Sequence, residues 1–172
     1  MRFQDIPQFT RGATYVVDVP WAVLDDSLGY YLGKYGLDLD PDFQRGYVWT
    51  PLQQTRYVEF ILRGGATGRD LYTNCPGWNR GHTKNFVMVD GKQRLTAARA
   101  FLDNKVPVFD GLLFRDFTDG LSMTGPGFKW HVNDLQTRAE VLQWYVDLNT
   151  GGTLHTDEEI DRVKALIEAE KR

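Results

Sequence analysis

The residues best suited to chemistry stand in one short stretch, where a turn leads into cationic and amide side chains. The stretch consists of Asp90, Gly91, Lys92, Gln93 and Arg94. If a helix begins here, its first N–H groups lack partners and carry partial positive charge, which suits an anion. Lys92 and Arg94 would then oppose the helix dipole, a conflict that an anionic ligand resolves. The stretch predicts an anion-binding turn; the alternative is that both cations are solvated or paired with Asp90.

The flanking residues predict the two elements that position this turn. Residues 86–89 form an apolar run that is too short for a helix and suits a buried strand. After the turn, apolar residues recur at three- and four-residue intervals and share one helix face: Leu95, Ala98, Phe101 and Leu102. We therefore expect a strand, a tight turn and a helix, in that order.

A second polar segment, residues 37–49, contains Arg45, whose planar guanidinium suits phosphate or carboxylate. Pro41 forbids an ordinary central strand, and a later glycine permits unusual backbone angles. We expect the segment to be extended at first and irregular afterwards, as binding loops commonly are. The alternative is that Arg45 only forms a salt bridge to Asp40 or Asp42.

Residues 64–85 are rich in Gly, Asn and Thr, and a connection of this length is typical of a lid, a binding loop or a flexible excursion. We expect a short strand inside it at Leu71 and Tyr72. Its basic and aromatic side chains make it the candidate for contact with a nucleic-acid strand: Arg69, Trp78, Arg80 and Lys84. The alternative is a mobile surface loop.

Periodicity and capping signals predict four more helices. They are residues 20–35 with Gly36 as the stop, a helix begun by Thr50, Pro51 and Gln53, residues 136–148, and a last helix begun by Thr156 and Glu159. The buried side of the helix that Thr50 begins is expected to consist of Leu52, Val58, Ile61 and Leu62.

Three more strands are expected, at residues 15–19, 106–109 and 112–114. Asp110 and Gly111 lie between the last two strands and give a hairpin signal. The following stretch, residues 115–134, is rich in glycine. We expect a loop there, tethered to the core by Phe117, Phe128 and Trp130.

The chain has 172 residues, of which 42% are hydrophobic and 25% charged, which is typical of one soluble domain. We expect residues 1–14 to be a flexible arm and residues 15–172 to form the domain. No apolar run is long enough to span a membrane, and the amino terminus lacks a signal-peptide core. We therefore expect a cytoplasmic protein.

Charge and potential metal ligands narrow the possible partners. The net charge of −3 disfavours strong nonspecific binding to a phosphate backbone, although a local basic patch would permit it. Cys75 is the only cysteine, which excludes an intramolecular disulfide and a Cys-rich zinc site. The three histidines have no paired ligand spacing and are expected to be surface residues: His82, His131 and His155.

Three separated stretches resemble the signature of the ParB/sulfiredoxin-like superfamily: residues 41–49, residues 89–96, and residues 148–154 followed by Glu158 and Glu159. Within it, the chain resembles the ParB-like domain that forms the amino-terminal half of GmrSD-type modification-dependent restriction enzymes. The resemblance covers nearly the whole chain. It implies the α+β fold class, as a single ParB/sulfiredoxin-like domain with a small mixed sheet packed against about four to five helices.

The resemblance also implies roles for individual residues around a nucleotide or another phosphate-bearing substrate. Asp90 would position Mg²⁺ or a nucleophilic group, and Gly91 would let the backbone approach phosphate. Gln93 and Arg94 would bind and polarise the phosphoryl oxygens. Two further catalytic residues would face the turn, Gln44 and Arg45. The remaining nucleotide-binding positions would be Lys92, Thr96, Asn149, Gly151 and Gly152.

The implied function is a nucleotide-dependent phosphohydrolase, either an NTPase or a DNA phosphodiesterase or nickase, that uses a nucleoside triphosphate and Mg²⁺ on or alongside DNA. Its context would be restriction, anti-restriction or DNA processing. The alternatives are a non-catalytic nucleotide-sensing or DNA- or partner-binding module, and a phage DNA-modification or counter-defence protein. Full-length relatives continue into a His-Asn-His nuclease domain beyond the position of Arg172, so we expect a partner protein to supply that half, and a phage or mobile-element origin.

Overall fold

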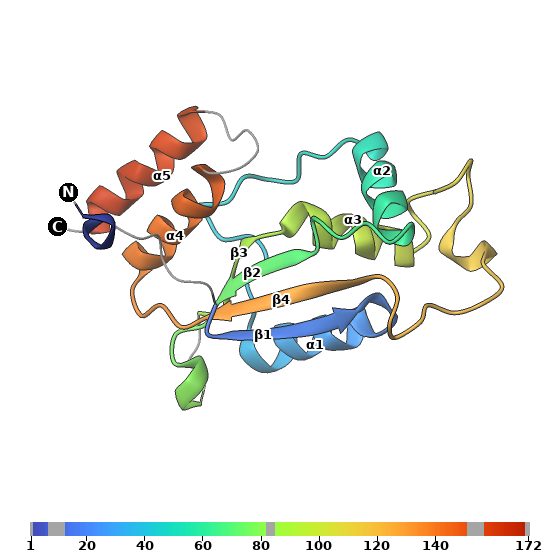
Figure 1. The fold of residues 1–172 in the computed structure, drawn as a ribbon, viewed down its shortest axis with the longest axis horizontal. Helices are drawn as coiled ribbons and strands as arrows, with labels where there is room; N and C mark the ends of the chain where they lie inside the picture. The colour runs from blue at the N-terminus through green and yellow to red at the C-terminus, as the bar shows by residue number, and fades with distance from the viewer. Residues whose placement is uncertain (1, 7–12, 82–84, 151–156, 171–172) are drawn as a thin grey trace.

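The computed structural model describes residues 2–6, 13–81, 85–150 and 157–170. Four strands form its centre: β1 (Tyr15–Pro20), β2 (Asp70–Asn74), β3 (Val87–Asp90) and β4 (Gly127–Asn133). They form one mixed sheet in the order β1-β4-β2-β3 (Figure 1). β1 and β4 are antiparallel, as are β2 and β3, whereas β4 and β2 at the centre are parallel.

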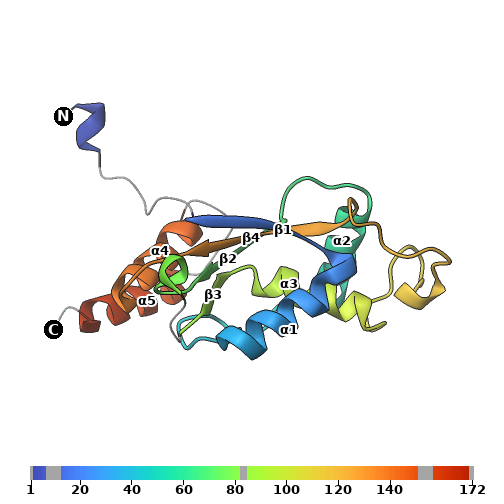
Figure 2. The ribbon, with the colours of Figure 1, turned by 90° about the horizontal axis from the view of Figure 1, so that it is seen from below.

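Five α-helices lie in the described part of the chain: α1 (Leu24–Tyr35), α2 (Pro51–Leu62), α3 (Lys92–Leu102), α4 (Arg138–Thr150) and α5 (Asp157–Glu170). Single 3-10 turns stand at Phe3–Asp5, Trp21–Val23, Trp78–Arg80 and Phe114–Asp116. α1 and α3 lie on the same side of the sheet, and α4 lies beside α5 at one end (Figure 2). The mixed sheet and its five helices confirm the predicted α+β fold class.

The apolar side chains form two cores that meet at β3. The larger core lies between the sheet and α1, α2 and α3, and its deeply buried aromatic residues are Trp21, Phe86, Phe101, Phe128 and Trp130. The smaller core lies between α4, α5 and the opposite side of β3, and it includes Phe43 and Tyr145. Met88 points into the larger core and Val89 into the smaller one. Because strand side chains alternate between faces, the turn after β3 begins at the boundary between the cores.

The predicted elements around the turn are confirmed. β3 and α3 form the expected strand and helix, and β1 covers the strand predicted at residues 15–19. α1 ends at Gly36, whose φ of 63° is left-handed and costs glycine little. At the start of α2, Thr50 Oγ1 accepts a hydrogen bond from Gln53 N at 3.3 Å, and Thr50 N donates to Gln53 Oε1 at 2.8 Å. This is the predicted capping box.

The loop predicted for residues 115–134 is wrong at its end, because β4 occupies Gly127–Asn133 and pairs with both β1 and β2. Phe128 and Trp130 are core residues of this strand rather than tethers of a loop. They alternate with the more exposed Lys129 and His131, which is the period of a strand with one buried face. Flanking glycines concealed that alternation in the sequence.

Two smaller predictions also fail. The hairpin predicted at residues 106–114 contains only an isolated bridge between Val108 and Leu112, since a 3-10 turn begins at once afterwards. Leu52 is 57% exposed, whereas Ile61 is buried, because the helical repeat of α2 places them on opposite sides. The short strand expected at Leu71 is confirmed and is longer than expected, as β2.

Several predictions fall on residues outside the described part of the chain. These are half of the expected arm at residues 1–14 and the cap at Thr156, although α5 does begin at Asp157. Thr14, at the end of the arm, donates from Oγ1 to Val132 O at 3.3 Å. None of the helices in the described part has both the length and the apolar character needed to cross a bilayer.

Candidate functional site

Gly91 joins β3 to α3, and two features of its surroundings require a glycine. Its φ of 105° is a left-handed conformation that other residues rarely adopt. A Cβ at this position would also lie 2.5 Å from Leu71 Cδ2 and 3.3 Å from Asp70 O, both on β2. The glycine therefore lets the turn lie directly against the neighbouring strand.

Both cations of the first turn of α3 are paired with carboxylates. Arg94 Nη2 donates to Asp90 Oδ2 at 2.7 Å, and these side chains are 23% and 34% exposed. Lys92, whose side chain is 13% exposed, forms an ion pair with Asp40 of the preceding segment. Both cations are thus paired with carboxylates, as in the alternative interpretation of the turn. Arg94 is paired with Asp90, whereas Lys92 is paired with Asp40. Arg94 Nε is buried and has no hydrogen-bond partner among the described residues.

Gln93 holds the backbone of the 37–49 segment. Its Oε1 accepts hydrogen bonds from Val48 N at 3.0 Å and Trp49 N at 3.2 Å. Its Nε2 donates to Gly46 O at 3.1 Å. In this structure both ends of the Gln93 amide are therefore engaged with backbone, and a contact with phosphoryl oxygens would require one of these bonds to break.

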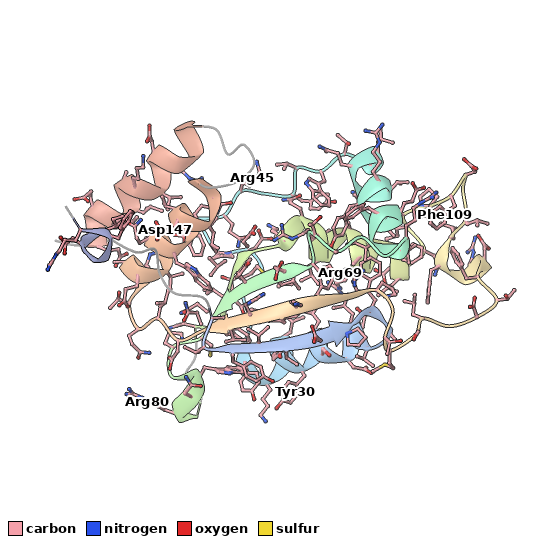
Figure 3. All side chains as sticks on the ribbon, in the orientation of Figure 1. Tyr30, Arg45, Arg69, Arg80, Phe109 and Asp147 are labelled. Atoms are coloured by element: carbon pink, nitrogen blue, oxygen red, sulfur yellow. The ribbon has the colours of Figure 1, made fainter. Side chains whose placement is uncertain are left out.

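Gln44 ties the same segment to β3, since its Nε2 donates to Met88 O at 2.6 Å. The neighbouring Arg45 is half-buried on the connection between α1 and α2 (Figure 3). Together with Lys92 and Gln93, these contacts bring the 37–49 segment onto the turn, as the family signature implies. The segment is extended at Asp38, which bridges Val87 in parallel, and has no regular structure later, as predicted.

A small pocket of about 40 Å³ opens at the turn. Its lining comprises Gln44, Arg45, Val89, Asp90, Gly91, Lys92, Gln93 and Tyr145. Four of the five predicted catalytic residues thus meet at one place, whereas Arg94 does not line the pocket and reaches it only through its ion pair with Asp90. The helical period of residues 136–148 gives no signal that Tyr145 of α4 forms a wall of this pocket. The volume suits roughly one water molecule, so a phosphate would lie at the mouth or widen the pocket.

The other predicted nucleotide-binding residues are less directly placed. Thr96 is half-buried on the second turn of α3 and does not line the pocket. Asn149 donates from Nδ2 to Tyr145 O at 2.6 Å, one turn earlier on α4, and does not line the pocket either. Gly151 and Gly152 lie outside the described residues.

The predicted nucleic-acid contacts do not form one surface. Trp78 packs among aromatic rings of the larger core, with centroids 5.3 Å from Tyr35 and 5.6 Å from Phe86. Arg80 is exposed, far from Arg69 in the fold (Figure 3). Lys84 lies outside the described residues. The aromatic residue of this loop is therefore an anchor to the core.

Arg69 instead lies close to the turn. Its Nε donates to Gly65 O at 2.7 Å, and the loop that it closes lies against Tyr57, which donates to Gly68 O at 2.9 Å. Burial raises the pKa of Tyr57, while the positive charges of Arg94 and Arg69 lower it. The positive charges of Arg94 and Arg69 therefore lie close enough to the Tyr57 hydroxyl to affect its pKa, which places Arg69 near the turn.

A larger cavity of about 860 Å³ lies between α1, β3 and the start of α4. It shares no lining residue with the pocket at the turn, and none of the predicted catalytic residues lines it. We assign the candidate site to the turn, because catalysis requires charged and amide groups that converge on one place, whereas a large cavity alone does not provide them.

The described residues contain no group of three or more side chains suited to hold a metal ion. Asp90 is the one carboxylate that lines the pocket, and only its Oδ2 accepts from Arg94. One carboxylate is enough for a Mg²⁺ ion that arrives with substrate phosphates and water. The donor set therefore fits a metal bound together with a nucleotide, and not a metal held by the protein alone.

The fold and the turn define a small α+β domain with a basic, amide-lined pocket at the junction of β3 and α3. The chain belongs to the family of GmrSD restriction endonuclease N-terminal domains, whose family model matches residues 28–130, more than half of the chain. The match includes the signature stretches at residues 41–49 and 89–96, whereas the stretch at 148–154 lies beyond it. Comparisons with curated proteins and with solved structures found no match.

Proposed function

We propose that this protein binds a nucleoside triphosphate at the turn after β3 and hydrolyses it, in a restriction-related process on DNA. The observation that carries the proposal is the pocket in which Arg45 and Gln44, from one segment, meet Asp90, Gly91 and Lys92 from another. The family description, which refers to a restriction endonuclease, supports the connection with DNA.

The cations give the pocket its affinity for phosphate. Arg94 does not line the pocket but pairs with Asp90, which does, so a phosphate bound beside Asp90 can compete for the guanidinium. Lys92 supplies a point charge, and Arg45 supplies a planar fork from the opposite side. Phosphoryl transfer depends mainly on positioning and on neutralising the oxygens, which is what these groups provide. Mg²⁺ bound with the nucleotide would add to that neutralisation, and Asp90 is the carboxylate that would hold it.

A free nucleotide fits this site better than a DNA backbone as the hydrolysed substrate. The pocket is small, and the basic residues of the 64–81 stretch point to separate places, with Arg69 near the turn and Arg80 far from it. The net charge of −3 also opposes strong binding of a polyanion. DNA would then be the partner that the nucleotide-dependent activity serves, and a DNA nickase is the second form of the proposal.

The test is a panel of nucleoside triphosphates with and without Mg²⁺, read by thermal shift and by phosphate release. A nucleotide that binds only the folded protein must raise Tm, and Mg²⁺ should then permit turnover. Arg45→Ala and Arg94→Ala should abolish phosphate release. Arg56→Ala, an equal change of charge on the exposed face of α2, should leave it unchanged. A flat panel, or full activity in Arg94→Ala, would refute the proposal.

A second candidate function is a nucleotide sensor without turnover. One observation favours it: Gln93 and Lys92 hold the 37–49 segment through its backbone and through Asp40, so a ligand at the turn would disturb a segment that leads into α2. Binding would then change the surface offered to DNA or to a partner protein. A Tm shift with no phosphate release, together with faster hydrogen exchange at the amides of Val48 and Trp49, would favour this function.

A further inference from the structure

The end of α2 and the loop that follows it carry a local positive charge. Residues 60–69 contain Arg63 and Arg69 and no acidic residue, although the whole chain has a net charge of −3. Neither guanidinium forms an ion pair within the described part of the chain, whereas Lys92 and Arg94 each pair with a carboxylate. This charge makes the segment a candidate surface for an anionic partner.

The two carboxylates that flank this segment are engaged elsewhere. Glu59 is half-buried, and its Oε1 accepts a hydrogen bond from Phe109 N at 2.7 Å. Asp70 is the first residue of β2, and its Oδ1 lies 2.7 Å from Nε2 of His131. The positive charge of residues 60–69 is therefore not cancelled by its neighbours in the chain.

An exposed aromatic ring lies beside both arginines. Phe60 is 45% exposed, and Arg63, three residues later, is its neighbour on the same face of α2. A Cβ at Gly65 would lie 2.3–2.5 Å from atoms of the Phe60 ring, so the loop backbone rests directly against the ring. Arg69 Nε donates to the carbonyl of the same glycine at 2.7 Å. Phe60, Arg63 and Arg69 therefore form one group, the Phe60 platform.

The arginines of the Phe60 platform are held in place and still have donors to offer. Cζ of Arg63 lies 5.0 Å from the centroid of the Phe109 ring, which orients the planar guanidinium. The N–H groups of Arg63 and the Nη groups of Arg69 have no hydrogen-bond partner in the described part of the chain. Side chains that are already oriented lose less entropy when they bind a ligand.

Arginines beside an aromatic ring suit a single strand of nucleic acid. Guanidinium groups bind phosphates, and the ring offers a stacking surface to an unpaired base. The bases of a duplex are stacked on one another, so only its phosphates would meet the platform and the Phe60 ring would stay unused. The exposed ring therefore favours a single strand over a duplex. DNA is the nucleic acid that the family description, which refers to a restriction endonuclease, supports.

The Phe60 platform is connected to the turn through the same loop. Tyr57 donates from its hydroxyl to Gly68 O at 2.9 Å. An added Cβ at Gly68 would lie 4.0 Å from Arg94 Cδ. A strand bound at the platform would therefore lie beside the loop that contacts Arg94, next to the nucleotide pocket and not inside it.

We propose that the Phe60 platform binds single-stranded DNA, with Arg63 and Arg69 on phosphates and Phe60 stacked on a base. The inference rests on the DNA partner in the proposed function and gives that partner a place on the molecule. Binding of this kind depends little on base sequence, because every base has a face that can stack.

The test is the fluorescence anisotropy of a labelled oligothymidylate, measured without nucleotide over a range of salt concentrations. Wild type should bind the single strand more tightly than a duplex of the same length. For a single strand, the logarithm of the binding constant falls with the logarithm of salt concentration by about 0.7 per phosphate contact. Arg63→Gln should therefore reduce this slope by about 0.7, and the double variant with Arg69→Gln by about twice that.

Two control variants separate specific contacts from general effects. Arg69→Lys keeps the charge and should keep the slope, which distinguishes the charge of Arg69 from its hydrogen bond to Gly65. Arg80→Gln removes an exposed arginine far from Arg69 in the fold and should bind as wild type does (Figure 3). Thermal unfolding of each variant shows that it is folded.

The stacking contact is tested by Phe60→Leu, with Phe60→Tyr as the conservative variant. Phe60→Leu keeps an apolar side chain against Gly65 but has no ring, so the affinity should fall by about fivefold or more while the salt slope stays the same. Phe60→Tyr keeps the ring and should bind as wild type does.

The outcomes separate the Phe60 platform from the proposed hydrolysis. No binding by wild type, a preference for the duplex, an unchanged slope in the double arginine variant, or full affinity in Phe60→Leu would overturn the platform and leave the hydrolysis standing. Wild-type protein that binds the strand as expected but hydrolyses no nucleotide would overturn the proposed hydrolysis and keep the platform.

Discussion

The larger and smaller cores hold the two walls of the candidate pocket in different ways. In the larger core, Trp130 Nε1 donates to Thr73 Oγ1 at 3.0 Å, and both side chains are fully buried. The smaller core is joined at its surface by exposed ion pairs, in which Arg138 contacts Asp42 at 2.9 Å and Glu170 at 3.0 Å. The smaller core also buries Phe43, Trp144 and Tyr145, but it has fewer buried aromatic side chains than the larger core. Buried aromatic packing is worth several times as much as an exposed ion pair.

This difference indicates which wall yields to a ligand. The turn with Gly91 lies against Leu71 of the larger core, whereas the opposite wall contains Tyr145, whose ring meets Phe43 at 5.4 Å in the smaller core. A pocket of about 40 Å³ must widen to admit a phosphate. We expect the side with Arg45 and Tyr145 to move and the turn to stay fixed.

The largest expected effect is that of Trp130→Ala. Removing a buried indole from the larger core should destabilise the fold by about 3–5 kcal/mol, and Thr73 Oγ1 would also lose its donor. The measurement is urea unfolding. Trp130→Phe, which keeps most of the apolar volume, should cost much less. If Trp130→Ala cost no more than a surface substitution, the larger core would not be the more rigid side.

Gly91→Ala should come next, because it combines a strained backbone with a clash. Gly111→Ala is the matched control, since Gly111 has a φ of 114° but open space around its Cβ position. The control should lose about 1–2 kcal/mol from backbone strain alone. Gly91→Ala should lose a further 1–3 kcal/mol or so, because Leu71 must move. Equal losses in the two variants would show that the turn does not depend on its contact with β2.

The sequence predicted the turn well because its signals are local. A run of apolar residues, Asp90-Gly91 and the following helical period lie within one short stretch, and the structure has the strand, turn and helix there. The capping box of Thr50 and the stop at Gly36 are local in the same way. Such signals need no knowledge of the rest of the fold.

The contact between His131 and Asp70 was not predictable in this way. His131 and Asp70 are 61 residues apart in the chain and meet only because β4 pairs in parallel with β2. A parallel pairing leaves no turn signal between its strands. The same reasoning applies to Tyr145, which reaches the pocket through the packing of α4 on β3. Gln93 was predicted at the site, but its bonds to the 46–49 backbone depend on a distant segment.

Gln93→Ala tests the joint between the two walls and should have a smaller effect on stability. It removes the hydrogen bonds from the Gln93 side chain to the backbone of Gly46, Val48 and Trp49. These backbone groups stay near solvent, so we expect the free energy of unfolding to fall by about 1–2 kcal/mol. The nucleotide-induced Tm shift should fall as the segment with Arg45 loosens. Gln143→Ala, which loses one exposed bond to Asp147, should stay within about 0.5 kcal/mol of wild type.

The smallest effect is expected at the edge of the smaller core, in Asp42→Asn. A hydrogen bond from Arg138 lowers the pKa of Asp42 below its usual value, and the charge of Arg138 adds to this. A carboxyl whose pKa is lower in the folded state stabilises that state. The stabilisation is complete at pH values above the pKa of the unfolded state, near 4, and is lost as the pH falls through the pKa of the folded state. The pair is largely exposed, so the gain is at most about 1 kcal/mol at pH 7.

Urea unfolding of wild type and Asp42→Asn at neutral pH and at about pH 3 measures this contribution, with the unfolded carboxyl titrating near pH 4. The stability gap, the difference in free energy of unfolding between wild type and Asp42→Asn, should be small at neutral pH and should narrow in acid. The exposed Asp119→Asn should show no such change. Added salt should also narrow the gap at neutral pH, because exposed charges are screened. A gap that widened in acid, or that equalled the loss in Gly91→Ala, would mean that the smaller core is the more rigid one. The turn would then be the wall that moves.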